Sequence, residues 1–276
     1  MFGSNSLHGW KILSVFIFFN LYHHFKEQRT EQNVNRVEIC LSNDLIMRKD
    51  EWNAPIIIPE HNIILWVIPK VGSTILKRFV ARIYNYNNWR HGWFHGPSTN
   101  HFKRLYQYNA SKVTDMMTSR KWVKIIFLRD PYKRLKSAYK DKNKQKGPKF
   151  TKTNKTYIET VCGYRPENFT VFVKMINNGC KDPHWDPQMH LIDKKWLKHI
   201  TFWGRLDHFC KDFKRITLKL HLWNMYGASG WNEKNGSICE STTPHQNKKN
   251  KIEVIDLPES IYNRYELDKK MLAPDI

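Results

Sequence analysis

The feature that most constrains the fold is a repeated unit in which an apolar strand, a tight turn and an amphipathic helix follow one another. The apolar run 63–68 ends at the turn 69–74, after which apolar residues recur at helical spacing. The same order recurs in 122–142 and in 200–220. Strands that alternate with helices predict an α/β fold, with a parallel sheet flanked by helices. Residues 258–272 predict a further helix at the C-terminus.

The charge of the chain indicates an anionic partner. Lys and Arg number 46 against 25 Asp and Glu, which gives a formal net charge of +21, and aromatic residues make up 14%. This aromatic content excludes intrinsic disorder. The charge suits nucleic acid, an acidic polysaccharide, an anionic membrane or a phosphorylated cofactor. Between Lys140 and Lys155, seven lysines accompany a single acid, Asp141. We expect this lysine run to attract a polyanion, although a solvated loop can have the same composition.

The N-terminal residues predict attachment to a membrane. A mostly apolar stretch runs from Leu7 to Phe25, and no small-residue cleavage site follows it. We therefore favour a cytoplasmic tail and uncleaved signal anchor in residues 1–26, over a cleaved signal peptide or a buried helix. Residues 27–58 are polar and predict a stem, and residues 59–276 predict the folded domain.

Sequons and cysteines point to a secretory compartment. Four N-x-[ST] triplets follow the apolar stretch, at Asn109, Asn154, Asn168 and Asn235. The chain has five cysteines, none in a C-x-x-C pair, which argues against a zinc knuckle or a thioredoxin motif. One or two disulfides are expected in an oxidising lumen, with at least one thiol unpaired. The sequence leaves the pairing open among Cys40, Cys162, Cys180, Cys210 and Cys239.

The turn 69–74 has the composition of an anion-binding loop. In an open parallel sheet, ligands bind beyond the carboxyl ends of the strands. Gly72 permits close approach of the backbone, Ser73 and Thr74 bring hydroxyls, and the next helix presents unsatisfied N–H groups. Lys70 lies inside the turn, which lacks the G-x-x-x-x-G-K-[ST] pattern of nucleoside triphosphatases. An ordinary strand-to-helix turn is the plain alternative.

The end of the second strand carries a guanidinium followed by a helical hydroxyl. Arg129 leaves the strand, and Asp130 is a favourable N-cap for the next helix. Arg134 and Ser137 fall on the same side of that helix as Asp130. Arg129 and Ser137 together can grip a second phosphate. Two phosphate sites at successive strand ends predict a pocket for a nucleotide with phosphates at separate positions.

These segments resemble Golgi carbohydrate sulfotransferases of the chondroitin/dermatan 4-O-sulfotransferase group. Residues 69–78, P-K-V-G-S-T-I-L-K-R, are similar to the 5′-phosphosulfate loop of that family. Residues 129–142, R-D-P-x-x-R-x-x-S-A-Y-x-D-K, are similar to its 3′-phosphate motif. Later matches follow in the family's order. They are F-x-x-F-V at 169–173, His184-Trp185 with Pro187, Phe202-x-Gly204, and Y-x-x-Y-x-L-D at 262–268.

The resemblance implies a P-loop-like sulfotransferase architecture that depends on 3′-phosphoadenosine 5′-phosphosulfate (PAPS). The implied reaction is in-line transfer of a sulfuryl group to a hydroxyl of an acidic or neutral glycan, with no metal and no nucleic-acid partner. The implied location is the Golgi membrane, as a single-pass type II protein with a lumenal catalytic domain. Lys70 is expected to stabilise charge on the bridging oxygen. The residues expected to hold the donor are Lys70, Val71, Gly72, Ser73, Thr74, Lys77, Arg78, Arg129, Arg134 and Ser137.

The sequence departs from that family in two places. The cysteine pair that the family carries after its His-Trp segment is replaced here by Ile192 and Lys195, so that disulfide must be absent. The loop after the 3′-phosphate helix is short, which leaves the acceptor site least defined.

A base must accept the proton of the acceptor hydroxyl. His184 is our candidate, because imidazole titrates near neutrality and flanking acids could orient it. A structural histidine packed beside Trp185 is the plain alternative. Weaker candidates for the base are His91, His95, His101, Asp182 and Asp186.

Two other classes of protein remain open from the sequence. A non-catalytic, secreted, basic glycosaminoglycan-binding protein would explain the charge but not the two phosphate motifs. A nucleotide kinase would use similar loops, but it needs a Walker-type lysine and Mg²⁺ ligands that the sequence lacks.

Overall fold

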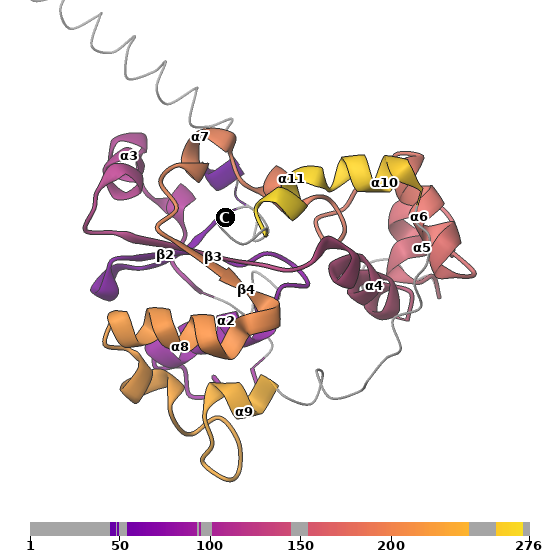
Figure 1. Ribbon diagram of the computed structural model, residues 1–276. Coiled ribbons are helices and arrows are strands. Elements are labelled where there is room, and N and C mark those ends of the chain that lie inside the picture. Colours follow the sequence, from indigo (N-terminus) through magenta and orange to yellow (C-terminus); the bar gives the residue numbers. More distant parts are fainter. Residues whose placement is uncertain are drawn as a thin grey trace, which may run out of the picture. The chain divides into compact units, whose positions relative to one another are not determined.

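A computed structural model describes residues 45–47, 49, 54–92, 94, 101–144, 154–242 and 258–272 of the chain (Figure 1). The expected signal anchor and His95 lie outside the described residues, as do Lys146, Lys149 and Lys152 of the lysine run. Among the helices that are described, none is long and apolar enough to cross a membrane.

A four-stranded sheet lies at the centre of the domain, in the order β1-β2-β3-β4. Three strands are parallel to one another. The apolar residues of β2 and residues 125–128 of β3 are buried as the continuous apolar runs predict, whereas Phe202 and Trp203 of β4 are half-buried. With helices on both faces, this arrangement confirms the predicted α/β fold. The strands are β1 (Ile56–Ile58), β2 (Ile63–Trp66), β3 (Val123–Leu128) and β4 (Phe202–Arg205).

The first strand corrects the predicted boundary between stem and domain. β1 pairs antiparallel with β2, with Ile57 opposite Ile64. Its three isoleucines are at most 1% exposed, and Ala54 just before them is 3% exposed. The folded domain therefore begins before residue 59, within the range 27–58 predicted as stem. The run Ile56–Ile58 is too short for its strand period to be recognised in the sequence.

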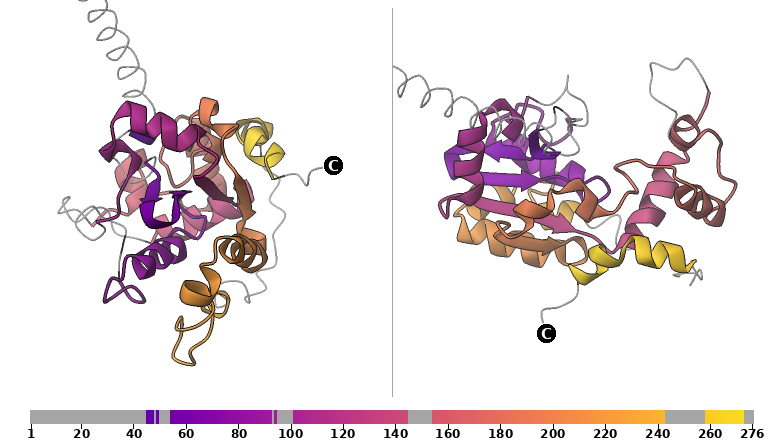
Figure 2. Two further views of the ribbon diagram at one scale, coloured as in Figure 1. Left: turned by 90° about the vertical axis from the view of Figure 1, so that its left-hand side faces the viewer. Right: turned by 90° about the horizontal axis from the view of Figure 1, so that it is seen from above.

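Helices cover both faces of the sheet (Figures 1 and 2). α2 (Ser73–Ile83) and α8 (Phe209–Lys219) lie on one face, where Phe79 meets Phe213 edge-on with ring centres 4.8 Å apart. α3 (Ala110–Thr118) and α7 (Lys194–Leu197) lie on the other face. These positions put the start of α2 at the carboxyl end of β2, where the sequence places the phosphosulfate loop.

A second apolar cluster joins helices beyond the carboxyl end of β3. The helices are α4 (Pro131–Lys142), α5 (Tyr157–Cys162), α6 (Phe169–Asn177) and α10 (Glu259–Arg264). Trp185, at 0% exposure, packs in this cluster and meets Phe172 edge-on at 5.4 Å. The other buried members are Leu135, Ala138, Ile158, Val173, Met175, Ile176, Ile261 and Tyr265. The segment that contains His184 is thereby attached to a packed core.

The C-terminal segment differs from the single helix predicted over 258–272. It forms two short helices, α10 and α11 (Glu266–Lys270), which meet at Tyr265, whose backbone leaves helical geometry at φ −106° and ψ 14°. Tyr265 is fully buried, and its hydroxyl donates to the carbonyl of Trp185. The other short elements are η1 (Leu45–Met47), η2 (Pro59–His61), η3 (Leu105–Gln107), η4 (Gln188–Leu191), η5 (Leu206–His208), η6 (Trp223–Gly227) and α9 (Ile238–Thr242).

Candidate functional site

The turn between β2 and α2 has the backbone geometry of an anion-binding loop. Lys70 and Gly72 both adopt left-handed conformations, with φ values of 66° and 72°. Gly72 is the N-cap of α2, and no side chain caps the helix. A Cβ on Gly72 would lie 3.0 Å from Leu206 Cδ1, so the turn is packed closely against η5. The uncapped first turn of α2 can therefore direct its N–H groups at an anion.

Arg129 connects this turn to the end of β3. Its Nη1 donates to the carbonyl of Lys70 at 3.0 Å. Gln188 holds the Arg129 backbone from both sides, because its Oε1 accepts from the Arg129 N–H and its Nε2 donates to the Arg129 carbonyl. Asp268 in turn accepts from the backbone N–H and the side-chain amide of Gln188. Asp268 of α11 thus fixes, through Gln188, the backbone of the arginine that the sequence assigns to the 3′-phosphate.

The Arg129 side chain keeps hydrogen-bonding capacity for a ligand. Its Nε is buried and has no hydrogen-bond partner within the described part of the chain. Burial lowers the pKa of the guanidinium, and the negative charges of Asp207 and Asp130 partly offset this. A buried donor without a partner costs free energy, which an anion at this position would recover.

Arg134 has a different role from the phosphate contact predicted for it. Its side chain is 0% exposed and donates to three backbone carbonyls. One belongs to Pro69 in the β2–α2 turn, and the others belong to Pro183 and Asp186 on either side of the His-Trp segment. Arg134 is therefore a structural residue that joins these two loops. Helical spacing placed it beside Ser137 but could not show which loops cover it.

The remaining predicted donor residues divide by exposure. Val71 and Lys77 are each 1% exposed, so almost none of either side chain reaches solvent. Thr74 is exposed, and partial exposure is shared by Gly72, Ser73, Arg78 and Ser137. The first turn of α2 thus includes two residues that solvent reaches, Ser73 and Thr74.

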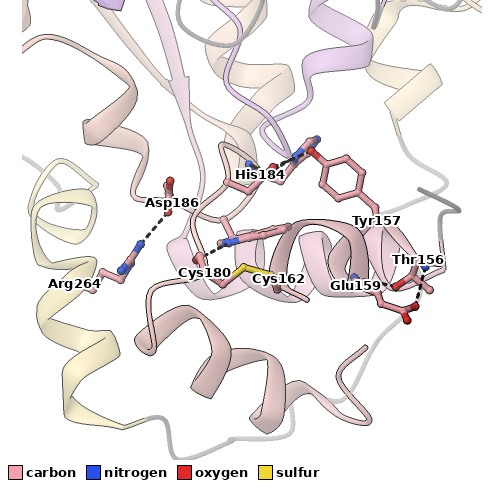
Figure 3. The surroundings of a disulfide bond; sticks show 10 residues. Thr156, Tyr157, Glu159, Cys162, Cys180, His184, Asp186 and Arg264 are labelled. Atoms are coloured by element: carbon pink, nitrogen blue, oxygen red, sulfur yellow. Dashed lines mark hydrogen bonds and ion pairs between the residues drawn. A yellow bond between two sulfur atoms is a disulfide. The ribbon is translucent and has the colours of Figure 1, made fainter. Parts of the chain in front are cut away.

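His184 forms a buried dyad with Asp182 (Figure 3). The Nδ1 of His184 lies 2.6 Å from Oδ1 of Asp182, and the same oxygen accepts from the His184 backbone N–H at 2.9 Å. Tyr157 donates its hydroxyl to Oδ2 at 2.8 Å. If Nδ1 carries the proton of the neutral ring, Nε2 is the basic nitrogen. This arrangement orients the imidazole as a proton acceptor requires.

The charges around His184 favour its neutral form. Burial lowers the pKa of the imidazole, the hydrogen bond that the ring donates to Asp182 raises it, and the positive charges of Lys142 and Lys70 lower it. These electrostatic interactions couple the His-Trp segment to the candidate catalytic lysine. The other histidines that the structure describes among the weaker candidates, His91 and His101, are exposed.

The two acids that flank His184, Asp182 and Asp186, have different partners. Asp182 orients the imidazole, whereas Asp186 forms an ion pair with Arg264 of α10 at 2.8 Å (Figure 3). Burial raises the pKa of Asp186, and the charge of Arg264 partly offsets this. Asp186 therefore attaches the loop that contains His184 to α10.

A disulfide links Cys162, at the end of α5, to Cys180 in the segment before Asp182 (Figure 3). Tyr157 lies on the same short helix as Cys162. The bond thus ties the two segments whose side chains meet at Asp182. It confirms that this chain contains a disulfide, and Cys210 and Cys239 are not part of a disulfide.

Four residues of the site were not predicted to belong to it from the sequence. Asp141 pairs with Lys70 Nζ at 2.9 Å, and Tyr157, Gln188 and Asp268 hold other site residues as described above. Asp141 and Asp268 stand inside the resembling motifs, which was the available signal. Tyr157 and Gln188 carry no local pattern, because their partners come from distant segments.

Comparison with known proteins gives one match. The model of the sulfotransferase family matches residues 54–273. Searches of curated proteins and of solved structures return no match. Among the described residues, no group of three or more His, Cys, Asp or Glu side chains is arranged to hold a metal ion. The matched residues cover most of the chain and include the β2–α2 turn, Arg129, the dyad, α10 and α11: the chain belongs to the sulfotransferase family.

Proposed function

We propose that this sulfotransferase transfers a sulfuryl group from PAPS to a hydroxyl of a glycan, with a chondroitin- or dermatan-type chain as the favoured acceptor. The observation that carries the proposal is the link between two anion-binding groups at successive strand ends. The uncapped start of α2 and the partly unpartnered Arg129 are joined by the 3.0 Å hydrogen bond from Arg129 to Lys70. A nucleotide with a 5′-phosphosulfate and a 3′-phosphate needs two such groups.

The residues present fit this donor. The first turn of α2, with Ser73 and Thr74, would bind the 5′-phosphosulfate, and Arg129 with Ser137 would bind the 3′-phosphate. PAPS, when bound, supplies the activated sulfuryl group. Lys70 lies in the turn that leads into α2, and its ammonium would stabilise negative charge on the leaving oxygen.

His184 is the proposed base. Its neutral imidazole, oriented by Asp182, would accept the proton of the acceptor hydroxyl at Nε2. The His184 side chain is 7% exposed, so an acceptor can reach only a small part of the imidazole. The lysine run, of which Lys144 and Lys155 are described and exposed, would attract an acidic polysaccharide to the domain.

We also propose that the domain lies in the Golgi lumen, attached as a single-pass type II protein by residues 1–26. The disulfide between Cys162 and Cys180 supports an oxidising compartment. The four sequons after the apolar stretch support the same orientation. A protease-protection assay on membrane vesicles, with glycosidase treatment of the sequons, tests this placement. A cytoplasmic, unglycosylated domain would contradict it.

The activity is tested by measuring sulfate transfer from PAPS to a panel of glycans. Lys70→Ala should lower turnover by roughly 10²–10³-fold, because it removes one electrostatic group from the reacting centre. Lys112→Ala, which changes an exposed lysine of α3, is the matched control and should keep the activity. Melting temperatures of both variants show whether the fold is intact.

Two results would contradict the proposed function. One is near-normal transfer by folded Lys70→Ala. The other is failure of the wild-type protein to bind immobilised adenosine 3′,5′-bisphosphate (PAP), or its release from that matrix by ATP as readily as by PAP. Binding of glycosaminoglycan without any transfer would favour the non-catalytic alternative.

A further inference from the structure

The ammonium of Lys70 already has an anionic partner within the chain. Its Nζ lies 2.9 Å from Oδ2 of Asp141 in the last turn of α4. The two residues are 71 positions apart, so the ion pair joins the β2–α2 turn to the far end of the 3′-phosphate helix. The side chains are 18% exposed for Lys70 and 49% exposed for Asp141, so a dissolved anion can reach the pair.

Asp141 is anionic where it meets Lys70. Burial alone would raise the pKa of its carboxyl, but the hydrogen bond and charge of Lys70, followed by the charge of Lys142, lower it below the usual range. Lys142 Nζ stands 3.9 Å from the same oxygen, Oδ2. A carboxylate oxygen held near two ammonium groups has the charge and hydrogen-bonding chemistry of a phosphate or sulfate oxygen.

The backbone of Lys70 is fixed independently of this ion pair. Arg129 donates to its carbonyl, and the residue is held at a φ of 66°. A change at Asp141 should therefore release the ammonium without moving the turn. The bond between Lys70 and Asp141 can be exchanged for a bond to a ligand at the start of α2.

We propose that Asp141 is an intramolecular competitor of the donor, which occupies Lys70 until the anionic phosphosulfate takes its place. This inference rests on the proposed function of the site. Asp141 acts through Lys70 and is a positioning residue. Because the pair is partly exposed, its net strength corresponds to about two- to fivefold in donor affinity.

A double-mutant cycle measured by calorimetry with PAP tests this role. Asp141→Asn should bind PAP about two- to fivefold more tightly than the wild type. In a Lys70→Met background, the same substitution should give a smaller gain, because no ammonium remains to be released. Asp141→Ser provides a second variant without the carboxylate, and melting temperatures verify that each variant is folded.

Asp207→Asn is the matched control for general charge. Asp207 is paired with Lys133 at 3.0 Å and influences Arg129, but it makes no bond to Lys70. Its removal should change PAP affinity by the same factor in both Lys70 backgrounds.

The outcomes distinguish the competitor role of Asp141 from the donor site itself. Weaker PAP binding by Asp141→Asn, or an equal gain with and without Lys70, would overturn the competitor role while leaving the donor site in place. Absence of PAP binding by the wild-type protein would overturn both the donor site and the competitor.

Discussion

At the scale of single residues, one carboxylate organises the candidate base. Both oxygens of Asp182 are used, one by His184 and the other by Tyr157. Burial raises the pKa of Asp182, but the hydrogen bonds that it accepts from His184 and Tyr157 outweigh this effect and lower it. Asp182 therefore stays ionised while the pKa of His184 lies below its usual value. This pair of shifts suits an ionised orienting group and a neutral base.

The dependence of activity on pH should report this pair. Because the pKa of His184 is lowered, kcat/KM should fall only below about pH 6.5. Asp182→Asn removes a contribution that raises this pKa, so the acid limb should move to lower pH while the plateau falls. Asp186→Asn, whose partner is Arg264, should leave the limb in place. Identical acid limbs for Asp182→Asn and the wild type would contradict the role of the dyad.

The sequence predicted the residues of the site better than their roles. Motif spacing singled out Lys70, Arg129 and His184. In the structure Arg129 donates to the carbonyl of Lys70, and the charge of Lys70 contributes to lowering the pKa of His184. Motif spacing could not separate Arg129 from Arg134, because both are basic residues at one strand end. The difference arises from loops distant in sequence, which supply three carbonyls to Arg134.

At the scale of elements, the close approach of β3 and β4 depends on a glycine. A Cβ on Gly204 would lie 2.4 Å from the ring of Phe127, so any larger residue displaces that ring. Phe127 is 1% exposed and packs against Phe209 and Phe213 of α8. This contact sets the position of β4 and hence of η5 beside the β2–α2 turn.

Gly204→Ala should therefore lower the free energy of unfolding by about 1–3 kcal/mol, as overpacking of a core does. Phe127→Leu in the same chain should recover part of that loss by making room for the new methyl group. Urea denaturation of the two single variants and the double variant measures both effects. Additive losses would show that the predicted contact does not limit the packing.

Element prediction succeeded where the apolar pattern was long and failed where it was short. The three strand–turn–helix units were predicted, and β2, β3 and β4 occur in them. β4 begins at Phe202 rather than at residue 200. At its other end, Gly204 belongs to the strand and not to the turn. The break at Tyr265 was not predicted, because it serves a contact with the carbonyl of Trp185 that local sequence does not encode.

At the scale of the whole domain, the site depends on a helical cluster attached to the sheet. The cluster carries Tyr157 and the His184 segment, and Leu135 of α4 packs in it. The disulfide between Cys162 and Cys180 closes a loop over a sequence separation of 18. Sequence showed that disulfides were expected but not this pairing, because pairing depends on how the helices pack.

Replacing both cysteines, in Cys162→Ser/Cys180→Ser, should cost about 3 kcal/mol of stability. Sulfate transfer should fall as well, because the bond ties the segments that meet at Asp182. Thermal unfolding under non-reducing conditions measures the first effect. Cys210→Ser, at a cysteine of α8 that forms no disulfide, is the control and should change the melting temperature far less. An unchanged melting temperature in the double variant would contradict the structural role of the disulfide.

The proposed function requires that the domain bind a nucleotide through phosphates at two separate positions. Its most direct test is calorimetric titration of the wild type and of Arg129→Ala with PAP and with adenosine 5′-phosphate, which lacks only the 3′-phosphate. The wild type should prefer PAP by roughly tenfold or more, since the 3′-phosphate gains charge-assisted hydrogen bonds. Arg129→Ala should lose most of this preference while its affinity for adenosine 5′-phosphate changes little. Equal affinities of the wild type for the two nucleotides, or a preference that survives in Arg129→Ala, would contradict the account.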